Sequence, residues 1–348
     1  MKKNLFGYTL EEIKHEIRAL SIPAFRAQQI VEWLYQRNAT DFQQMINLPK
    51  AMRQLLAEHF SIMYVEVLRQ QTSKDNQTTK ILLGYPDGIT VETVLMRHSY
   101  GNSVCVSSQA GCAMGCIFCA STLNGLIRNL TTGEILAQVI YMNNLLQKEN
   151  QKVNTIVIMG SGEPLANYEN VLGFIRLCHA PYTLNLGYRN ITLSTSGIVP
   201  MIERLATEKL PITLSISLHA SNDSIRSELM PINRHYDIHM LTVAANNYAL
   251  ATGRRVTYEY ILVAGKNDSA ACAHELSKLL KGQLANVNLI PVNPVIERGL
   301  DRPDLATITT FAQILSNHHI QVTIRREMGN DIQAACGQLR NQHLAEQS

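Results

Sequence analysis

Three cysteines, Cys112, Cys116 and Cys119, lie within eight positions in the stretch GCAMGCIFCAS. Thiolates bind zinc and iron–sulfur clusters, so this spacing predicts a metal site. Structural zinc takes four protein ligands, and a zinc site here would need a distant fourth one. A [4Fe-4S] cluster held by only three thiolates leaves one iron open for a small molecule, as catalytic metal sites do. The spacing therefore favours a cluster with an open position.

Four further cysteines, Cys105, Cys178, Cys272 and Cys336, stand outside this triplet. An odd total of seven cysteines in 348 residues does not indicate a disulfide scaffold. Cys178 and Cys272 fall inside helical patterns, and we interpret them as structural. Cys105 and Cys336 could each be an ordinary buried thiol, because lone cysteines usually are.

The charge balance limits the ways in which the chain could bind nucleic acid. Lys and Arg number 31 against 28 Asp and Glu, a net charge of +3, so contact with RNA or DNA would depend on local clusters. The candidates for phosphate contact are Arg254–Arg255, Arg325–Arg326, Arg189, Arg128 and Lys2–Lys3. The N-terminal stretch lacks an apolar signal core, and no 18-residue apolar run occurs. We expect a cytoplasmic protein that does not contact membranes.

From residue 101 onward, apolar strand patterns alternate with amphipathic helix patterns. The expected strands are 103–108, 154–159, 190–195, 211–217, 256–263 and 285–292. The expected helices are 131–149, 168–179, 198–208, 238–251, 270–281 and 304–318. Six βα units in succession predict an α/β fold with a parallel sheet curled into a partial barrel.

The region before this barrel has a different pattern. Residues 1–61 predict a small helical accessory domain, with a capping box at Thr9 and Glu12. Residues 62–100 alternate with a period of two between turn signals, which predicts an antiparallel β extension with Glu92 on its third strand. The barrel then spans 101–320, and 321–348 forms a C-terminal strand and segment.

Small polar motifs follow five of the expected strands: GSGEP, STSG, SLHAS, GKND and PVNP. The carboxyl ends of the strands hold the chemistry of βα barrels, so five motifs in equivalent places predict one site. The GSGEP motif lacks the third glycine of a dinucleotide-binding fingerprint, which argues against an ordinary Rossmann methyltransferase.

A C-x3-C-x2-C triplet at the end of the first barrel strand resembles the signature of radical S-adenosylmethionine (SAM) enzymes. The resemblance implies a radical SAM (βα)6 partial TIM-like barrel with one [4Fe-4S] cluster per chain, held by Cys112, Cys116 and Cys119. It implies that the open iron binds the methionine part of SAM. Reduction then cleaves SAM to methionine and a 5′-deoxyadenosyl radical.

Other motifs narrow the resemblance: VETV, CVSSQAGC, RNLTTGEI, GSGEPLAN, SLHASND, LMPIN, VNLIPVNP and DIQAACGQL. This string, from residue 91 to 339, resembles the dual-specificity RNA adenine-C2 methyltransferases. The helical front end is similar too, which implies that residues 1–61 engage RNA. The implied substrates are an adenosine in the peptidyl transferase region of 23S rRNA and the adenosine next to the anticodon in tRNA. An electron donor such as flavodoxin or ferredoxin is implied as well, and we expect a monomer.

The resemblance also implies roles for three residues outside the cluster triplet. C2 of adenine is an electron-poor carbon, so a polar transfer from a sulfonium methyl fails and a radical route is required. In such a route a thiolate can hold the methyl group first. Cys336 matches the cysteine that is methylated by one SAM, and a second SAM supplies the radical that activates that methyl group. Cys105 matches the thiol that resolves the RNA–protein adduct through a transient disulfide. Glu92 matches the proton acceptor, although as a lone strand residue it could be merely solvated.

Contacts to SAM are implied for the motifs at the strand ends. Seven residues match the family's cofactor-binding positions: Gly162, Glu163, Ser194, Ser217, Leu218, His219 and Asn293.

Three alternatives remain open on the sequence. A related family of antibiotic-resistance enzymes methylates C8 instead of C2. A radical SAM activating enzyme would generate a protein radical and would have no use for Cys336. A protein that only binds RNA, stabilised by zinc or by an iron–sulfur cluster, would not cleave SAM.

Overall fold

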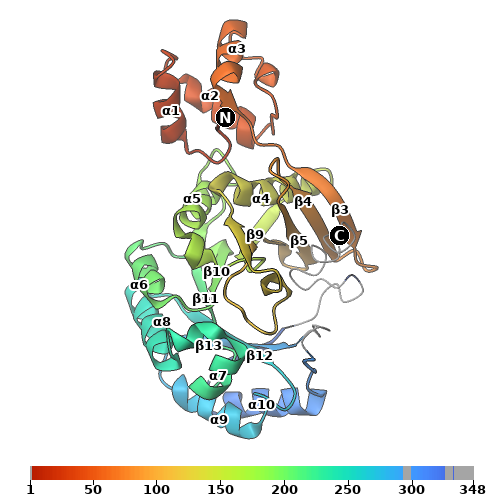
Figure 1. The fold of residues 1–348 in the computed structure, drawn as a ribbon, viewed down its shortest axis with the longest axis vertical. Helices are drawn as coiled ribbons and strands as arrows, with labels where there is room; N and C mark the ends of the chain where they lie inside the picture. The colour runs from red at the N-terminus through yellow and green to blue at the C-terminus, as the bar shows by residue number, and fades with distance from the viewer. Residues whose placement is uncertain (1, 293–298, 326–331, 333–348) are drawn as a thin grey trace.

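The computed structural model describes residues 2–292, 299–325 and 332, and in this part of the chain ten strands form one sheet (Figure 1). Seven neighbouring strands are parallel: β6 (Gly101–Cys105), β9 (Val153–Ile158), β10 (Ile191–Thr195), β11 (Thr213–Ser217), β12 (Val256–Leu262), β13 (Ala285–Pro291) and β14 (Gln321–Ile324). Beyond β6 the sheet continues with antiparallel pairing through β5 (Thr90–His98), β4 (Thr78–Gly84) and β3 (Glu66–Thr72).

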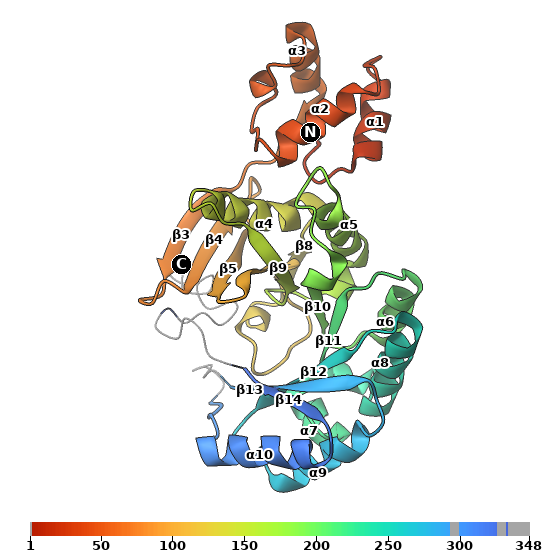
Figure 2. The same ribbon diagram turned by 180° about the vertical axis from the view of Figure 1, so that it is seen from behind.

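Helices cover the outer side of this curved sheet (Figures 1 and 2). They are α4 (Thr132–Gln147), α5 (Tyr168–His179), α6 (Val199–Thr207), α8 (Ile238–Thr252), α9 (Ala270–Leu279) and α10 (Leu305–Asn317). Each lies where the periodicity predicts a helix, and the expected α/β partial barrel is confirmed. The short helix α7 (Asp223–Leu229) was not expected. No helix in the described residues is long and apolar enough to cross a membrane.

The two faces of the parallel strands differ because successive side chains point to opposite sides. On the helix-covered face the side chains are apolar and fully buried, as at Ile156, Leu214 and Tyr258. On the concave face they are small or polar, as at Ser194 and Ser217. The apolar face forms the core, and the concave face is left to provide the site.

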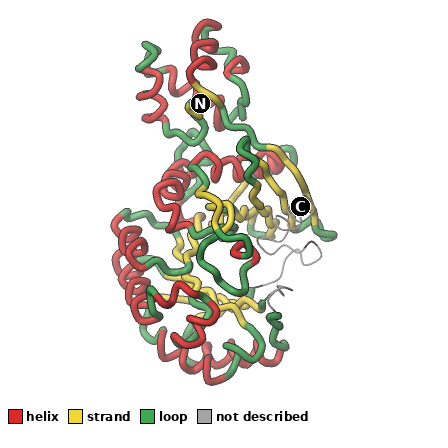
Figure 3. Tube along the Cα trace, in the orientation of Figure 1, coloured by secondary structure: helices red, strands yellow, loops and turns green. Residues whose placement is uncertain are grey.

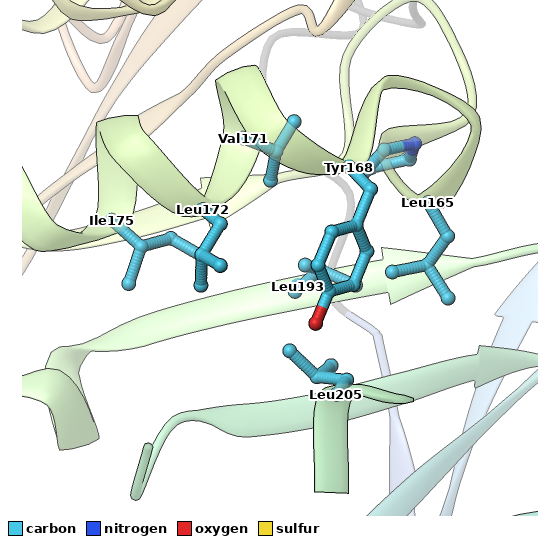
Figure 4. A pocket seen from close by; sticks show the side chains of 8 residues that line it. Leu165, Tyr168, Val171, Leu172, Ile175, Leu193 and Leu205 are labelled. Atoms are coloured by element: carbon cyan, nitrogen blue, oxygen red, sulfur yellow. The ribbon is translucent and has the colours of Figure 1, made fainter. Parts of the chain in front are cut away.

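A recess on the helix-covered side belongs to this core (Figure 4). Leu193 of β10 and Leu205 of α6 face α5 across it. The side chains that line it are Pro164, Leu165, Tyr168, Val171, Leu172, Ile175, Leu193 and Leu205. Its lining is apolar apart from the hydroxyl of Tyr168, which donates to Glu208, so it is a feature of packing and not a reaction site.

The N-terminal residues form a helical module at one end of the molecule (Figure 3). It contains α1 (Leu10–Arg18), α2 (Arg26–Tyr35) and α3 (Lys50–His59), and strand β1 (Lys3–Asn4) pairs with β2 (Phe60–Ser61). The expected capping box of Thr9 and Glu12 is present. The Leu10 amide donates a hydrogen bond to Tyr182 Oη at 3.0 Å, which joins the module to the barrel.

The first testable prediction concerns the packing of Gly160, which follows β9. A Cβ added there would lie 2.7 Å from the backbone nitrogen of Ser107. We expect Gly160→Ala to lower the free energy of unfolding by about 1–3 kcal/mol, the usual effect of overpacking. Gly187→Ala is the matched control, because its nearest neighbour would be 3.9 Å away. Denaturant unfolding of both variants measures the difference, and equal stabilities would contradict the prediction.

Candidate active site

Strand β6 runs into the loop that contains the cysteine triplet. This loop lies inside the curve of the sheet in both views (Figures 1 and 2). The Cys112 amide donates to the carbonyl of Gly125 at 3.0 Å, and Thr122 Oγ1 donates to the carbonyls of Cys116 and Cys119 at 3.1 and 2.9 Å. These bonds fix the backbone on both sides of the thiols.

The three thiols lie close enough to influence one another electrostatically. Burial raises the pKa of Cys112 to about 11 and raises that of Cys116 as well, and the neighbouring cysteines add to both shifts. Buried thiols of this kind lose their protons when a cation binds, because the metal supplies the missing positive charge. The donor set therefore fits a metal-containing group.

No group of three or more His, Cys, Asp or Glu side chains among the described residues is already gathered around a single ion position. An iron–sulfur cluster does not require that arrangement, because each thiolate binds a different iron. Cys112, Cys116 and Cys119 are the residues that would hold such a cluster.

The loop after β9, GSGEP, is hydrogen-bonded to the segment that precedes the cysteines. The Glu163 amide donates to Gln109 Oε1 at 2.7 Å, and Asn167 Nδ2 donates to the carbonyl of Ser108 at 2.8 Å. Gly162 has a φ of +108°, and a Cβ there would lie 2.6 Å from the Gln109 side chain. This glycine is thus required for the close approach of the two segments.

Glu163 is buried at the bottom of this loop. Its carboxylate accepts hydrogen bonds from Thr195 Oγ1 at 2.8 Å, the Ser196 amide at 2.7 Å and the Leu165 amide at 2.9 Å. Burial raises the pKa of Glu163 in spite of these donors. A carboxylate can accept about four hydrogen bonds, so capacity remains for one more donor, and a cationic donor would also compensate the buried charge.

The SLH motif follows β11 and faces the cysteine loop. The amides of Leu218 and His219 donate to the carbonyl of Glu259 on β12. His219 Nδ1 accepts from the Ile261 amide at 3.0 Å, and the ring meets Phe118 edge-on with centroids 4.7 Å apart. Burial, together with the Arg226 charge, lowers the pKa of His219 to about 3, so this imidazole is neutral at physiological pH.

Glu92 and Cys105 lie on adjacent strands of the same sheet. Val94 of β5 is opposite Cys105 of β6, which makes Glu92 a diagonal neighbour of Cys105 on one face. The hydroxyl of Ser107 donates to the carbonyl of Glu92 at 2.8 Å, so the strands remain adjacent beyond the regular ladder. The strand register brings the expected acid–base residue and the expected thiol together at the carboxyl end of β6.

The alternative that Glu92 is a solvated surface residue is wrong. Its side chain is 6% exposed and forms an ion pair with the fully buried Lys80, with Nζ and Oε2 3.3 Å apart. The sequence did not reveal this pair, because Lys80 and Glu92 lie on different strands and meet only through the register of β4 with β5.

Glu259 is a second residue that the sequence did not single out. It lies on the concave face of β12, where it accepts from Ser215 Oγ and from Asn288 Nδ2, both at 2.7 Å. Burial raises the pKa of its carboxyl group, and the positive charge of Arg325 opposes that shift. The sequence signal that could have identified it is a single glutamate within the largely apolar strand pattern VTYEYILV.

The structure separates the arginines that the sequence proposed for phosphate contact. Arg128 is paired with Asp87 and Glu134, each at 2.7 Å. Arg189, Arg254 and Arg255 precede β10 and β12, so they lie at the amino ends of the strands, away from the cysteine loop. Arg325 follows β14 at the carboxyl edge. Among the described members of this set, Arg325 and Arg128 lie beside the site, because Arg128 is on β8 (Leu126–Asn129), which pairs with the segment that leads into the cysteine loop.

The N-terminal basic pair makes intramolecular contacts. Lys3 is paired with Glu16 at 2.7 Å, and Lys2 Nζ donates to the carbonyl of Ala57. Three further residues of interest, Asn293, Arg326 and Cys336, lie outside the described residues.

Two family models match the chain. The Ribosomal RNA large subunit methyltransferase N-terminal domain matches residues 3–62, and the Radical SAM superfamily matches residues 106–274. A protein of Desulforamulus reducens named "Probable dual-specificity RNA methyltransferase RlmN" is 50% identical over 98% of this chain and 97% of its own length. The chain belongs to the RlmN family. A protein of the same name from Symbiobacterium thermophilum is 51% identical over 98% of this chain and 92% of its own length.

A solved structure agrees with this membership. The crystal structure of a radical SAM methyltransferase from Sphaerobacter thermophilus superimposes with a TM-score of 0.93 and 44% identity, covering 97% of this chain and 98% of that one. The RlmN family and the radical SAM fold expected from the sequence are therefore confirmed. Membership of the radical SAM superfamily implies an iron–sulfur cluster and SAM.

The second prediction tests Glu163. We expect Glu163→Gln to weaken SAM binding about tenfold to a hundredfold, because a hydrogen bond to a charged group contributes ~1.5–3 kcal/mol. Without SAM, the stability of wild type relative to Glu163→Gln should rise as the pH falls, because the raised pKa of the buried Glu163 means that its carboxylate is less favourable than its protonated form.

Calorimetry with SAM and thermal unfolding at pH 7 and pH 5 provide the measurements. Glu203→Gln, at an exposed position of α6, is the control for the same chemical change. SAM affinity that is equal in wild type and Glu163→Gln would contradict the prediction.

Proposed function

We propose that this RlmN-family protein methylates C2 of adenosine in 23S rRNA and in tRNA. The main support is the register that places Glu92 and Cys105 diagonally on one face, at the strand edge that leads into the cysteine loop. This is the arrangement expected for an acid–base residue and a thiol that act on the same RNA base. The polar concave face provides the surface on which SAM and the target base would be held.

Each group has a distinct role in this proposal. Cys112, Cys116 and Cys119 hold the cluster, and Glu163, Gly162, Ser194, Ser217, Leu218, His219 and Asn293 position SAM. When bound, the cluster and SAM supply an electron and a 5′-deoxyadenosyl radical. Two SAM molecules are used per turnover: one methylates Cys336, and the other activates that methyl group.

The protein's own residues then release the product. Once the methyl carbon is joined to C2, the base is tied to Cys336 through a methylene thioether. The adduct radical would give one electron back to the cluster, and Glu92 accepts the C2 proton. The Cys105 thiolate then attacks the sulfur of Cys336, and the displaced methylene carbon takes the electron pair of the C–S bond and is protonated to the methyl group. The resulting disulfide between Cys105 and Cys336 is later reduced. The ion pair with the fully buried Lys80 holds the Glu92 side chain in place.

The RNA substrates determine the remaining partners. The target adenosine must leave its stack to enter the concave site, which suits an RNA loop better than a duplex. We propose a cytoplasmic monomer that receives electrons from a flavodoxin or ferredoxin. Because His219 is neutral, it contributes packing and hydrogen bonds but does not attract RNA phosphates by charge.

The decisive test is product identification. Anaerobically reconstituted protein is incubated with SAM, reductant and unmodified 23S rRNA or tRNA, and the nucleosides are identified by mass spectrometry. We expect 2-methyladenosine from both RNAs. Recovery of 8-methyladenosine alone would show the related C8 activity, and no methyladenosine together with no SAM cleavage would indicate a binding protein.

The third prediction concerns Glu92. We expect Glu92→Gln to retain methylation of Cys336 but to lose 2-methyladenosine and accumulate an RNA–protein adduct, because the C2 proton has no acceptor. Gel shift under denaturing conditions and protein mass spectrometry detect these states. Removing one member of a buried ion pair destabilises by ~3–5 kcal/mol, so Lys80→Met/Glu92→Gln serves as a control that removes both. Normal turnover in either variant would exclude Glu92 as the acceptor.

The fourth prediction concerns Cys336. We expect Cys336→Ala to take up the cluster and cleave SAM, yet to form no methylated RNA, because the methyl group has no carrier. Cys178→Ala is the control, since Cys178 is buried in the core cluster on α5. Full RNA methylation by Cys336→Ala would contradict the proposed route. Generation of a protein radical in a partner instead of RNA methylation would support an activating enzyme.

A further inference from the structure

Arg226 on α7 is fully buried, and it is among the largest fully buried side chains of the described residues. Its guanidinium donates to the carbonyls of Ser196 at 2.7 Å, Ser217 at 3.2 Å and Leu218 at 3.1 Å. Further bonds go to Asn233 Oδ1 at 2.9 Å and to the carbonyl of Tyr236 at 3.3 Å. One side chain thus ties together the loops after β10 and β11.

All these acceptors are neutral oxygens. Burial of a cation is unfavourable unless negative charge compensates it, and hydrogen bonds to neutral groups compensate only in part. Burial lowers the pKa of Arg226 to about 10, which still leaves the guanidinium charged at neutral pH. The described surroundings thus leave this buried cation only partly compensated.

The cysteine loop packs directly against the segment that contains Arg226. Leu229 and Met230 form a buried cluster with Cys116, and the Ile117 amide donates to the carbonyl of Leu229 at 3.1 Å. Arg226 and Cys116 lie within range of mutual electrostatic influence. The buried cation is therefore positioned behind the loop that would hold three thiolates.

Among the described residues, three titratable groups face Arg226 from the elements around it. Asp223, on α7, and Cys116, on the cysteine loop, both favour its charged form. His219, at the end of β11, is neutral and adds no charge. Asp223 is exposed, so solvent screens its charge. Negative charge on the cysteine loop would consequently be the main buried compensation for this cation.

We propose that Arg226 is a positioning residue with an electrostatic role: its buried charge stabilises the reduced form of the cluster held by the triplet, and so raises the reduction potential. Reduction adds one electron from the external donor, and no atom is transferred. A fixed cation nearby favours the state with the extra negative charge, and net charge is among the factors that set such potentials. The inference rests on the proposed cluster site but not on the identity of the methylated atom.

The test is a redox titration of reconstituted protein without RNA, followed by electron paramagnetic resonance of the reduced cluster. Iron content and circular dichroism first establish that each variant is loaded and folded. We expect Arg226→Gln, which removes the charge, to shift the midpoint potential to a more negative value. Arg226→Lys, which retains the charge but has fewer donors, should keep the wild-type potential while melting at a lower temperature.

Two controls separate charge from structure. Asn233→Ala removes one hydrogen-bond acceptor of Arg226 without changing the charge, so the potential should stay the same. Arg176→Gln makes the same chemical change on α5, where Arg176 is half exposed and paired with Glu208. It too should leave the potential unchanged.

An unchanged potential in loaded Arg226→Gln would show that Arg226 is only a structural clamp and would overturn the inference. If that variant does not fold, Arg226→Lys decides, because a more negative potential with the charge retained would overturn the inference equally. Failure of the proposed function appears elsewhere, as RNA without 2-methyladenosine, and leaves these potentials measurable.

Discussion

The pairing of β6 with two different kinds of neighbour is the constraint on which the site depends. On one side β6 pairs in parallel with β9, the first step of the barrel, and on the other it pairs antiparallel with β5. Because β5 runs in the opposite direction, its first half lies beside the carboxyl end of β6. Glu92, near the start of β5, is thereby brought to the end of the sheet where the barrel strands have their carboxyl ends. Without that reversal the extension would present Glu92 at the far edge of the sheet.

Hydrogen bonds between loops then hold the strand ends in one arrangement. The loop after β9 is tied to the segment after β6 by Gln109, and to the loop after β10 by Glu163. The loops after β10 and β11 share Arg226. Each link joins consecutive strands of the sheet, so a displacement of one loop would disturb the next. This continuity preorganises the concave face before any ligand binds.

The sequence predicted the barrel well because its signals are local. An apolar run such as NITLST, followed at once by STSG, identifies both a strand and the place where it ends, and the structure has β10 there. The cysteine spacing and the capping box of the N-terminal helix are equally local. The contacts of Lys80 and Arg226 could not be predicted, because they depend on strand register and on a seven-residue helix too short to show periodicity. The backbone of His219, with a φ of +57°, likewise results from tertiary context.

The buried charges of the concave side follow a common rule. Glu92 has a bonded cation, Lys80, on the neighbouring strand. The carboxyl groups of Glu163 and Glu259 are bonded within the described chain only by neutral donors, and burial raises the pKa of both. Arg226 has the opposite sign and is likewise bonded by neutral groups. Such groups are most stable when a ligand of opposite charge binds. SAM has an ammonium and a sulfonium centre, and thiolates around iron are negative. The carboxylates thus suit the cofactor, and the buried arginine suits the metal loop.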